Sequence, residues 1–155
     1  MIVRLSEIYG AGSHEGINNL IGLVRKVPVV PYPSGVSPLA PLFLDDAIEG
    51  IVACLERDDN IYNATYMLAG PSSYTFLELI SVISRVLKLK RFALPLPLIL
   101  FRVLTILSRK MHRPVLRYDQ LARMVCLKDD DINRARTDLN FNPRSFEDGL
   151  KKLIY

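Results

Sequence analysis

The stretch "RLSEIYGAGSHEGINNLI" (residues 4–21) determines which fold the start of the chain is predicted to have. It runs from a strand-like segment through three glycines into an amphipathic segment. A buried strand, a glycine-rich turn and a helix in this order form the phosphate-binding loop of a dinucleotide site. Ser6 and Glu7, however, lie where such a strand should still be apolar. The segment that would be the next strand, "VPVVPYPSG" (residues 27–35), is interrupted by proline and has no acidic residue to hold a ribose. We therefore interpret the glycines as a turn between a strand and a helix: Gly10, Gly12 and Gly16.

The composition is that of a globular protein. The chain has 155 residues, of which 50% are hydrophobic and 23% charged, and this length suits one domain. The net charge is +4, but Lys and Arg are scattered among 16 acidic residues without the aromatic interleaving of a nucleic-acid platform. We therefore expect no nucleic-acid partner.

Cysteine and histidine usage predicts neither a metal site nor a disulfide scaffold. Cys54 and Cys126 lie far apart without a Cys-x-x-Cys motif, and the two histidines are His14 and His112. This usage fits a reducing compartment, so we expect a cytoplasmic protein. The short apolar start, which is followed by Arg4 and Glu7, is not expected to be a signal peptide.

The most apolar stretch, "FALPLPLILFRVLTIL" (residues 92–107), is not expected to span a membrane. It contains two prolines and an arginine and is shorter than the roughly 18 apolar residues that spanning requires. Its stripe of Leu98, Phe101 and Leu104 is typical of a core helix, and peripheral membrane contact stays open.

The first part of the chain, residues 1–91, alternates predicted strands and helices. Strands are expected at the start, as a short edge piece within 27–35, at 42–44 and within 63–71. Helices are expected over 15–26, after Asp45 as N-cap with Asp46 stabilised by the helix dipole, and after the capping box of Thr75 and Glu78. This order predicts an α/β fold.

The second part, residues 92–155, is predicted to be mainly helical. Helices are expected over about 97–108, 119–124 and 130–139, and after "NPRS" with Ser145 and Asp148 as a cap. The acidic residues 129–131 lack the spacing of a calcium loop and are expected to cap a helix.

Four segments in this order resemble a known family. "RLSEIYG" (4–10) resembles an Arg-Pro-x-x-x-Tyr-Gly strand with Leu5 in place of proline, and "LFLDDAIEGI" (42–51) is similar to a strand ending in Val-Asp-Asp-Val-Ala. "YMLAGPSSYTFLELISVISRVL" (66–87) and "DDDINRARTDLNFNPRSFEDGLKK" (129–152) complete the set, the latter with Asn140 in place of a glycine. Together they resemble the C-terminal half of extended or atypical short-chain dehydrogenase/reductases of the NAD-dependent epimerase/dehydratase type. The resemblance implies a truncated protein, with 1–155 as one substrate-binding portion in which a partial Rossmann-type sheet grades into a small α-rich lobe.

The resemblance also implies where ligands bind. By position, Leu5, Ser6 and Ile8 would contact the cofactor and Glu7 and Tyr9 the substrate, although Ser6 and Glu7 also suit a solvated turn. No tyrosine is followed four positions later by lysine, so the family's proton-transfer pair is missing, as is its nucleotide loop. We therefore expect no catalytic residue in this chain, inactivity on its own, and NAD or NADP as the cofactor of the full-length relative without tight binding here.

Residues 37–41, "SPLAP", stand where sugar-nucleotide members of the family carry an arginine that clamps a phosphate. This difference predicts a small-molecule substrate that is not a sugar nucleotide, and the apolar character of 94–107 is closer to atypical members related to an accessory subunit of respiratory complex I. We expect the substrate-binding portion of an epimerase/dehydratase- or reductase-like protein; the alternative is a stand-alone interaction or self-associating module. Either would leave sheet edges open, so the expected partner is a missing N-terminal Rossmann half or a second copy.

Overall fold

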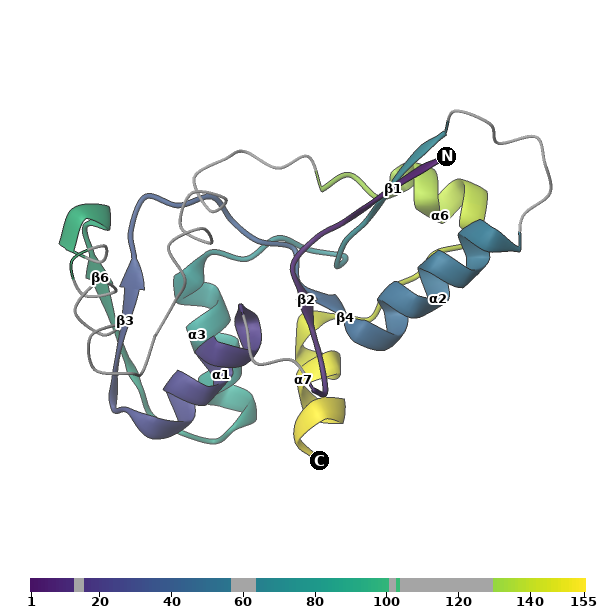
Figure 1. The fold of residues 1–155 in the computed structure, drawn as a ribbon. Coiled ribbons are helices and arrows are strands. Elements are labelled where there is room, and N and C mark those ends of the chain that lie inside the picture. The colour runs from purple at the N-terminus through teal and green to yellow at the C-terminus, as the bar shows by residue number, and fades with distance from the viewer. Residues whose placement is uncertain (13–15, 57–63, 101–102, 104–129) are drawn as a thin grey trace. The chain divides into compact units, whose positions relative to one another are not determined.

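The chain forms two compact units, which we describe separately. The computed structural model describes residues 1–12, 16–56, 64–100, 103 and 130–155 (Figure 1). Unit 1 comprises residues 1–13, 39–73 and 129–155, and unit 2 comprises 14–38 and 74–128. Both contain parallel strands and helices, so the predicted α/β class is confirmed. The division of the chain at residue 91 stays a prediction.

Unit 1 contains two short parallel ladders. β1 (Ile2–Leu5) pairs with β5 (Thr65–Leu68), with Ile2 opposite Thr65 and Leu5 opposite Leu68. β2 (Ile8–Tyr9) pairs with β4 (Leu42–Phe43). These strands confirm the predictions for the start of the chain, for 42–44 and for 63–71. Parallel pairing places the carboxyl ends of β1 and β5 at the same edge.

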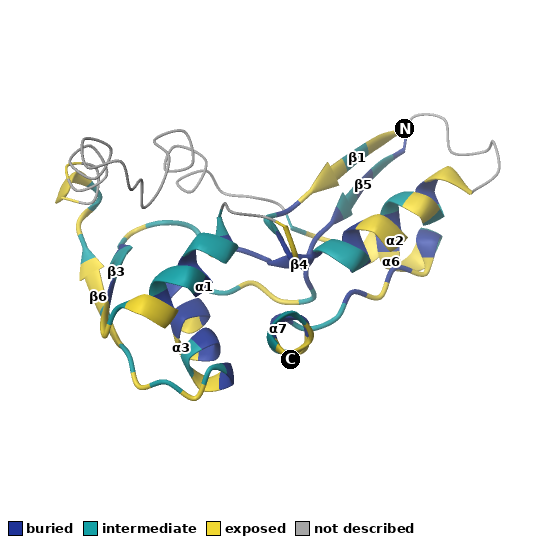
Figure 2. Cartoon of the chain, turned by 60° about the horizontal axis from the view of Figure 1, so that its bottom comes forward, coloured by how far each residue is buried: buried dark blue, intermediate teal, exposed yellow. Residues whose placement is uncertain are grey.

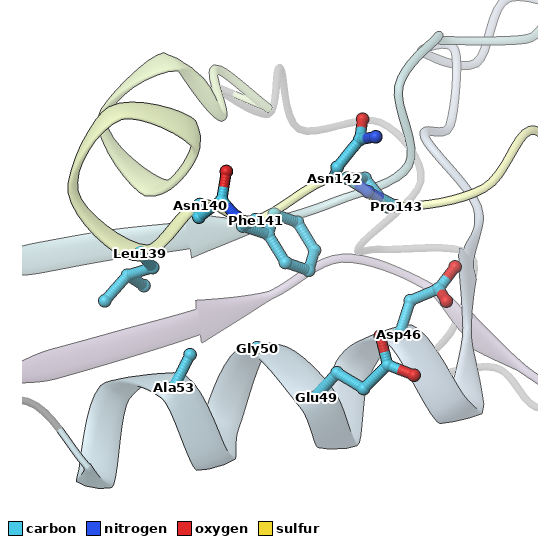
Figure 3. A pocket seen from close by; sticks show the side chains of 9 residues that line it. All are labelled: Asp46, Glu49, Gly50, Ala53, Leu139, Asn140, Phe141, Asn142 and Pro143. Atoms are coloured by element: carbon cyan, nitrogen blue, oxygen red, sulfur yellow. The ribbon is translucent and has the colours of Figure 1, made fainter.

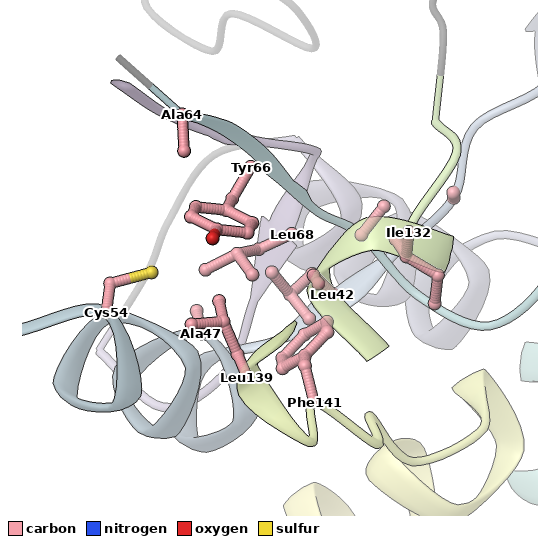
Figure 4. Close-up of a cluster of buried hydrophobic side chains, with 12 residues drawn as sticks. Leu42, Ala47, Cys54, Ala64, Tyr66, Leu68, Ile132, Leu139 and Phe141 are labelled. Atoms are coloured by element: carbon pink, nitrogen blue, oxygen red, sulfur yellow. The ribbon is translucent and has the colours of Figure 1, made fainter. Parts of the chain in front are cut away.

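The described residues of unit 1 also form the helices α2 (Leu44–Leu55), α6 (Asn133–Leu139) and α7 (Phe146–Ile154). α2 and α6 pack on β5 around a cluster of buried side chains that includes Leu42, Leu68 and Phe141 (Figure 4). A Cβ atom at Gly50 would lie 2.8 Å from Leu68 and 3.0 Å from Phe141, so glycine lets α2 approach this cluster. Tyr66 is also buried there, and its hydroxyl donates a 3.0 Å hydrogen bond to Asp138.

Helix α7 begins as the sequence predicts. Ser145 is its N-cap: the Ser145 Oγ accepts a hydrogen bond from the backbone N–H of Asp148 at 3.2 Å and donates one to the Asp148 carboxylate at 2.6 Å. These bonds satisfy an N–H group that the first turn of a helix leaves without a partner.

Asn140, the C-cap that follows helix α6, has φ 53° and ψ 31°. This left-handed conformation costs an ordinary residue about 1–2 kcal/mol, and asparagine tolerates it better than other residues with a Cβ. We expect Asn140→Ala to lower the free energy of unfolding by about 1 kcal/mol and Asn140→Gly to leave it unchanged or raise it, measured by urea denaturation. Equal effects of the two substitutions would show that the backbone conformation is not what selects asparagine.

The described residues of unit 2 include α1 (Ile17–Lys26), β3 (Val29–Pro33), α3 (Phe76–Val86) and β6 (Phe92–Leu96). α1 packs against α3 and buries the apolar side of the segment that the sequence predicts to be amphipathic: Ile17, Leu20, Ile21 and Val24. β3 and β6 pair in parallel, from Val29 opposite Phe92 to Pro33 opposite Leu96. The sequence analysis placed no strand over 92–96, and this was wrong. Proline has no N–H to donate, but it can lie in a strand that is paired on one side only.

The capping box predicted at the start of α3 is confirmed. The Thr75 hydroxyl accepts a 3.3 Å bond from the backbone N–H of Glu78, and the Glu78 carboxylate accepts a 2.7 Å bond from the backbone N–H of Thr75. The backbone bond from Thr75, followed by the bond from its hydroxyl, lowers the pKa of Glu78 below its usual value of 4.5.

This pKa shift predicts a pH dependence of stability. Because the folded pKa is depressed, the contribution of the box is fully present above pH 4.5 and is lost as the pH falls through the lower, folded pKa. Glu78→Gln keeps an acceptor but cannot titrate, so we expect the stability difference between wild type and variant to shrink as the solution is acidified. Urea titrations at a series of pH values measure this, and a difference that is constant with pH would contradict it.

Several predictions fall wholly or partly outside the described residues. These are the helix at 119–124, part of the helix at 97–108, His14, His112 and Cys126. Within the ranges that the structure describes, no helix has both the length and the apolar character needed to cross a membrane.

Candidate functional site

The candidate site lies in unit 1, in the connection from β1 to β2. The backbone N–H of Ser6 donates a 3.0 Å bond to the carbonyl of Leu68 at the end of β5, and the N–H of Leu42 donates a 2.9 Å bond to the carbonyl of Glu7. The connection is therefore held on both sides at the carboxyl end of the β1–β5 ladder. In open α/β sheets, ligands bind at this end of the strands.

A second loop reaches the same edge after β5. The N–H of Gly70 donates a 3.3 Å bond to the carbonyl of Ala40, and a Cβ at Gly70 would clash with the carbonyl of Pro41, whose carbon would lie 3.0 Å away. Glycine is needed here because two backbone segments touch. The loops that follow β1 and β5 and precede β4 are thus fixed together by backbone contacts.

Ser6 is the least satisfied residue of this edge. Its side chain is buried, with 9% exposed, and its Oγ has no hydrogen-bond partner among the described residues. A buried hydroxyl without a partner is costly, and such groups mark places where a ligand or water belongs. Ser6 therefore fits the cofactor-contacting role that the sequence assigns to it, and that role stays a prediction.

The unpaired hydroxyl predicts an unusual stability effect. We expect Ser6→Ala to raise the free energy of unfolding by about 1 kcal/mol, because the substitution removes a desolvated polar group without opening a large cavity. Thermal denaturation followed by circular dichroism measures this. A destabilised Ser6→Ala would show that the hydroxyl is paired in the native state.

The other predicted residues occupy different environments. Leu5 is 43% exposed, and Glu7 and Ile8 are half-buried, so all three remain accessible for the contacts predicted for them. Tyr9 is fully buried, its hydroxyl donates a 3.3 Å bond to the carbonyl of Phe146, and its ring meets the rings of Phe43 and Phe146 edge-on at 5.4 and 5.1 Å. The observed role of the Tyr9 side chain is packing, and its substrate contact stays a prediction.

A largely buried ion pair, which the sequence does not predict, lies near the start of α2. α2 begins at Leu44 after Phe43, without a side-chain cap, so the prediction of Asp45 as N-cap is wrong. Asp46 lies in the first turn, as the dipole argument requires, but its carboxylate is buried against Arg144: the Nη2 and Nε atoms lie 2.7 and 2.8 Å from Oδ1, and the Arg144 backbone N–H is 2.9 Å from Oδ2. The hydrogen bond that the Arg144 guanidinium donates to the Asp46 carboxylate raises the pKa of Arg144 above its usual value.

Asp45 has a separate, exposed partner. Its carboxylate lies 2.8 Å from the Nζ of Lys152, and this hydrogen bond lowers the pKa of Asp45 below its usual value. Both pairs start from the first turn of α2. Asp45 pairs with Lys152 in α7, and Asp46 pairs with Arg144, the residue before the N-cap of α7. No local spacing predicts them, because the partners lie about a hundred residues apart in the chain.

A hollow of about 200 Å³ lies between α2 and the segment Leu139–Pro143 (Figure 3). Its polar lining includes Asp46, which is already paired with Arg144, and Glu49, which is exposed. None of the predicted site residues lines it. We therefore place the candidate site at the β1–β2 connection and not in this hollow.

The described residues also contain no cluster of three side chains able to hold a metal ion. Cys54 is buried in the unit 1 core, and burial raises the pKa of its thiol. An apolar environment of this kind makes a cysteine unreactive.

The glycines of the opening stretch have separate roles. A Cβ at Gly10 would lie 2.6 Å from the Cβ of Leu44, so Gly10 serves the packing of β2 on the start of α2 within unit 1. Gly16 precedes α1 in unit 2. Gly12 has φ 80° and nothing within 4 Å of a Cβ, which suits a turn.

Comparison with known proteins shows which folds this chain resembles. No family model matches the chain. Over 132 residues it is 26% identical to UDP-glucuronic acid decarboxylase 1 of Arabidopsis thaliana, a match that covers 84% of this chain and 25% of that protein.

Solved structures match the chain over nearly its whole length. UDP-glucuronic acid 4-epimerase from Bacillus cereus, in complex with UDP-glucuronic acid and NAD, has a TM-score of 0.66 at 22% identity, covering 99% of this chain and 43% of that one. dTDP-glucose 4,6-dehydratase from Bacillus anthracis, in complex with NAD, has a TM-score of 0.65 at 15% identity, covering 97% and 42%. The structural neighbours are NAD-dependent epimerases and dehydratases, and the resemblance read from the sequence is confirmed for the fold. The chain spans less than half of these structures and a quarter of the curated relative.

Proposed function

We propose that this chain is the substrate-recognising portion of an NAD(P)-dependent epimerase/dehydratase-like protein and works together with a nucleotide-binding portion. The observation that carries the proposal is the open β1–β5 ladder. Parallel sheets of two strands are rarely stable alone, and parallel strands are usually covered on both faces.

The side chains of β1 support this proposal. Ile2 and Leu5 are 58% and 43% exposed, although they belong to a strand whose neighbour β5 carries the buried Tyr66 and Leu68. Within the residues described, β1 pairs with β5 alone. A further parallel strand on β1 would satisfy its free backbone groups and cover apolar area.

The polar groups of the site suit such a composite arrangement. The buried Ser6 hydroxyl lies at the strand end, where a nicotinamide nucleotide would approach, and Leu5 and Ile8 would supply the apolar walls. The NAD or NADP supplies hydride transfer when bound. Glu7 would orient the substrate, and the proton-transfer pair would come from the nucleotide-binding portion because this chain has no Tyr-x-x-x-Lys.

We propose that the substrate is a small molecule without a nucleoside diphosphate. Leu39 and Ala40 are 3% and 1% exposed, so the segment that precedes β4 offers packing and no cation for a phosphate. The Bacillus cereus epimerase does bind UDP-glucuronic acid. This makes UDP-glucuronic acid the direct comparison ligand.

Calorimetry tests the cofactor part of the proposal. NAD, NADH, NADP and NADPH titrated into the isolated chain should give no micromolar binding. Mixing with a nucleotide-binding portion encoded in the same genome, recognised by Gly-x-x-Gly-x-x-Gly and Tyr-x-x-x-Lys, should restore it, and Ser6→Ala should weaken the restored affinity.

Two results would overturn the proposal, and a third would refute only the substrate class. Micromolar binding by the chain alone would show that it holds its own nucleotide site. A mixture that never binds the cofactor, with the isolated chain forming a stable dimer by analytical ultracentrifugation, would favour the self-associating module. Binding of UDP-glucuronic acid by the restored complex would refute the proposed substrate class alone.

A further inference from the structure

The positive charge of the chain is concentrated in one segment. From residue 79 to residue 118 there are nine Lys and Arg and no Asp or Glu, although the whole chain has a net charge of only +4. The prediction that Lys and Arg are scattered among acidic residues is therefore wrong for residues 79–118. The rest of the chain is net acidic.

The described part of unit 2 carries this imbalance on its surface. Its one carboxylate is Glu78, which is engaged in the capping box with Thr75. Arg85, Lys88 and Lys90 are exposed at the end of α3 and in the turn that leads to β6.

Arg91 connects the end of α1, which carries Arg25 and Lys26, to the start of β6. Its Nε and Nη2 atoms donate bonds of 2.7 and 3.1 Å to the carbonyls of Val24 and Arg25. The exposed Arg25 and Lys26 at the end of α1 therefore lie beside the start of β6. We call the resulting surface the basic-apolar face: Arg25, Lys26, Arg85, Lys88, Lys90 and Phe92.

Large apolar side chains are exposed next to these cations. Phe92 and Leu94 on β6 are 77% and 47% exposed, and Val29, opposite Phe92 on β3, is 45% exposed. Figure 2 shows β6 largely in the exposed colour. Ile99 and Leu100, beyond the strand, are 77% and 53% exposed.

A hollow of about 560 Å³ opens on the same face. Leu77, Ile80 and Phe92 provide apolar walls, and Lys90 stands among the lining residues. The Oγ of Ser84, also in the lining, is buried and has no hydrogen-bond partner among the described residues. Apolar walls with a cation and an unsatisfied hydroxyl suit an amphiphile that has an anionic head.

The composition of the segment distinguishes a lipid surface from a protein partner. Residues 85–100 consist only of Lys, Arg and apolar residues, without one neutral hydrogen-bonding side chain. Protein interfaces carry about one hydrogen bond per 100–200 Å², whereas binding at an anionic bilayer needs only cations and apolar side chains that insert between head groups.

We propose that the basic-apolar face binds the surface of a bilayer that contains anionic phospholipids. The cations contact lipid phosphates, and Phe92, with its neighbours Val29 and Leu94, inserts at the level of the head groups. This inference is independent of the proposed function.

Sedimentation of the full chain with vesicles tests the proposal. We expect binding to phosphatidylcholine vesicles that contain about 30 mol% phosphatidylserine, weaker binding as salt is added, and little binding to pure phosphatidylcholine. Each Lys or Arg near an anionic surface raises the partition coefficient about fivefold, so the double variant Lys88→Gln/Lys90→Gln should lower this coefficient about 25-fold. Phe92→Ser should lower it at least fivefold, with unchanged circular dichroism because the side chain is exposed.

A matched control removes two charges from unit 1. Arg134 and Arg136 are exposed on α6, and Arg134→Gln/Arg136→Gln gives the same change in net charge as the lysine pair. It should leave vesicle binding nearly unchanged. If both double variants lost vesicle binding equally, the binding would depend only on the net charge of the chain and not on this face, and the proposal would be overturned.

Two other outcomes would also overturn it. Failure of the folded wild-type chain to bind the anionic vesicles at low salt excludes the bilayer as the occupant. A dimer in sedimentation equilibrium that Lys88→Gln/Lys90→Gln dissociates, without vesicle binding, would assign the face to a second copy.

Discussion

Asp46→Ala should lower the free energy of unfolding by about 3 kcal/mol. The Asp46 side chain is 5% exposed and accepts two hydrogen bonds from Arg144, from Nε at 2.8 Å and from the backbone N–H at 2.9 Å, and the Arg144 Nη2 lies 2.7 Å from Oδ1 in the same ion pair. Removing the carboxylate leaves the Arg144 guanidinium, whose side chain is 26% exposed, without its partner, and an unpaired charge that is mostly shielded from water is costly. Arg144 also lies 4.8 Å above the ring of Phe43, so losing the carboxylate releases a contact with β4.

The neighbouring residue supplies the control. Asp45→Ala breaks the pair with Lys152, in which both side chains are about half exposed, and should change stability little. Urea denaturation of the two variants and of Arg144→Ala gives the comparison. The double variant Asp46→Ala/Arg144→Ala should lose less than the sum of the single losses, because no unpaired buried charge remains. Equal effects of Asp45→Ala and Asp46→Ala would contradict the role of burial.

Local patterns predicted most of the elements. The stripe of α1, the capping box of α3 and the Ser145 cap of α7 are present where the sequence places them, because each depends on residues three or four apart. The predicted start of α2 lies two residues after the observed one, because the N-cap is Phe43 and not Asp45. Asp45 has the chemistry of an N-cap, but the helix begins before it and leaves its carboxylate to Lys152.

What the sequence could not predict depends on long-range contacts. β6 was missed because Pro95 and Pro97 disfavour a strand, whereas pairing with β3 stabilises one over 92–96. The Asp46–Arg144 pair joins residues 98 positions apart. The candidate site was located by resemblance and not by spacing, and the unsatisfied hydroxyl of Ser6 became visible only with its surroundings.

The contact between Tyr9 and Gly149 is also long-range, and it predicts the second large effect. Gly149 is buried in the middle of α7, where alanine normally stabilises a helix by roughly 0.5–1 kcal/mol. A Cβ here would clash with the Tyr9 hydroxyl and lie 2.9 Å from its Cζ and 3.1 Å from the Phe43 ring. Since both rings are buried, we expect Gly149→Ala to lower the free energy of unfolding by about 2–3 kcal/mol.

A double-mutant cycle separates the clash from other effects of alanine. Tyr9→Phe alone loses the bond to the Phe146 carbonyl and should cost about 1 kcal/mol, but in the Gly149→Ala background it removes the clashing oxygen and should cost less or stabilise. Gly22→Ala in α1 is the matched control, because nothing lies within 4 Å of its Cβ and it should raise stability by about 0.5 kcal/mol. Thermal denaturation of the four variants measures these differences. Additive effects of Tyr9→Phe and Gly149→Ala would mean that α7 does not rest on the Tyr9 hydroxyl.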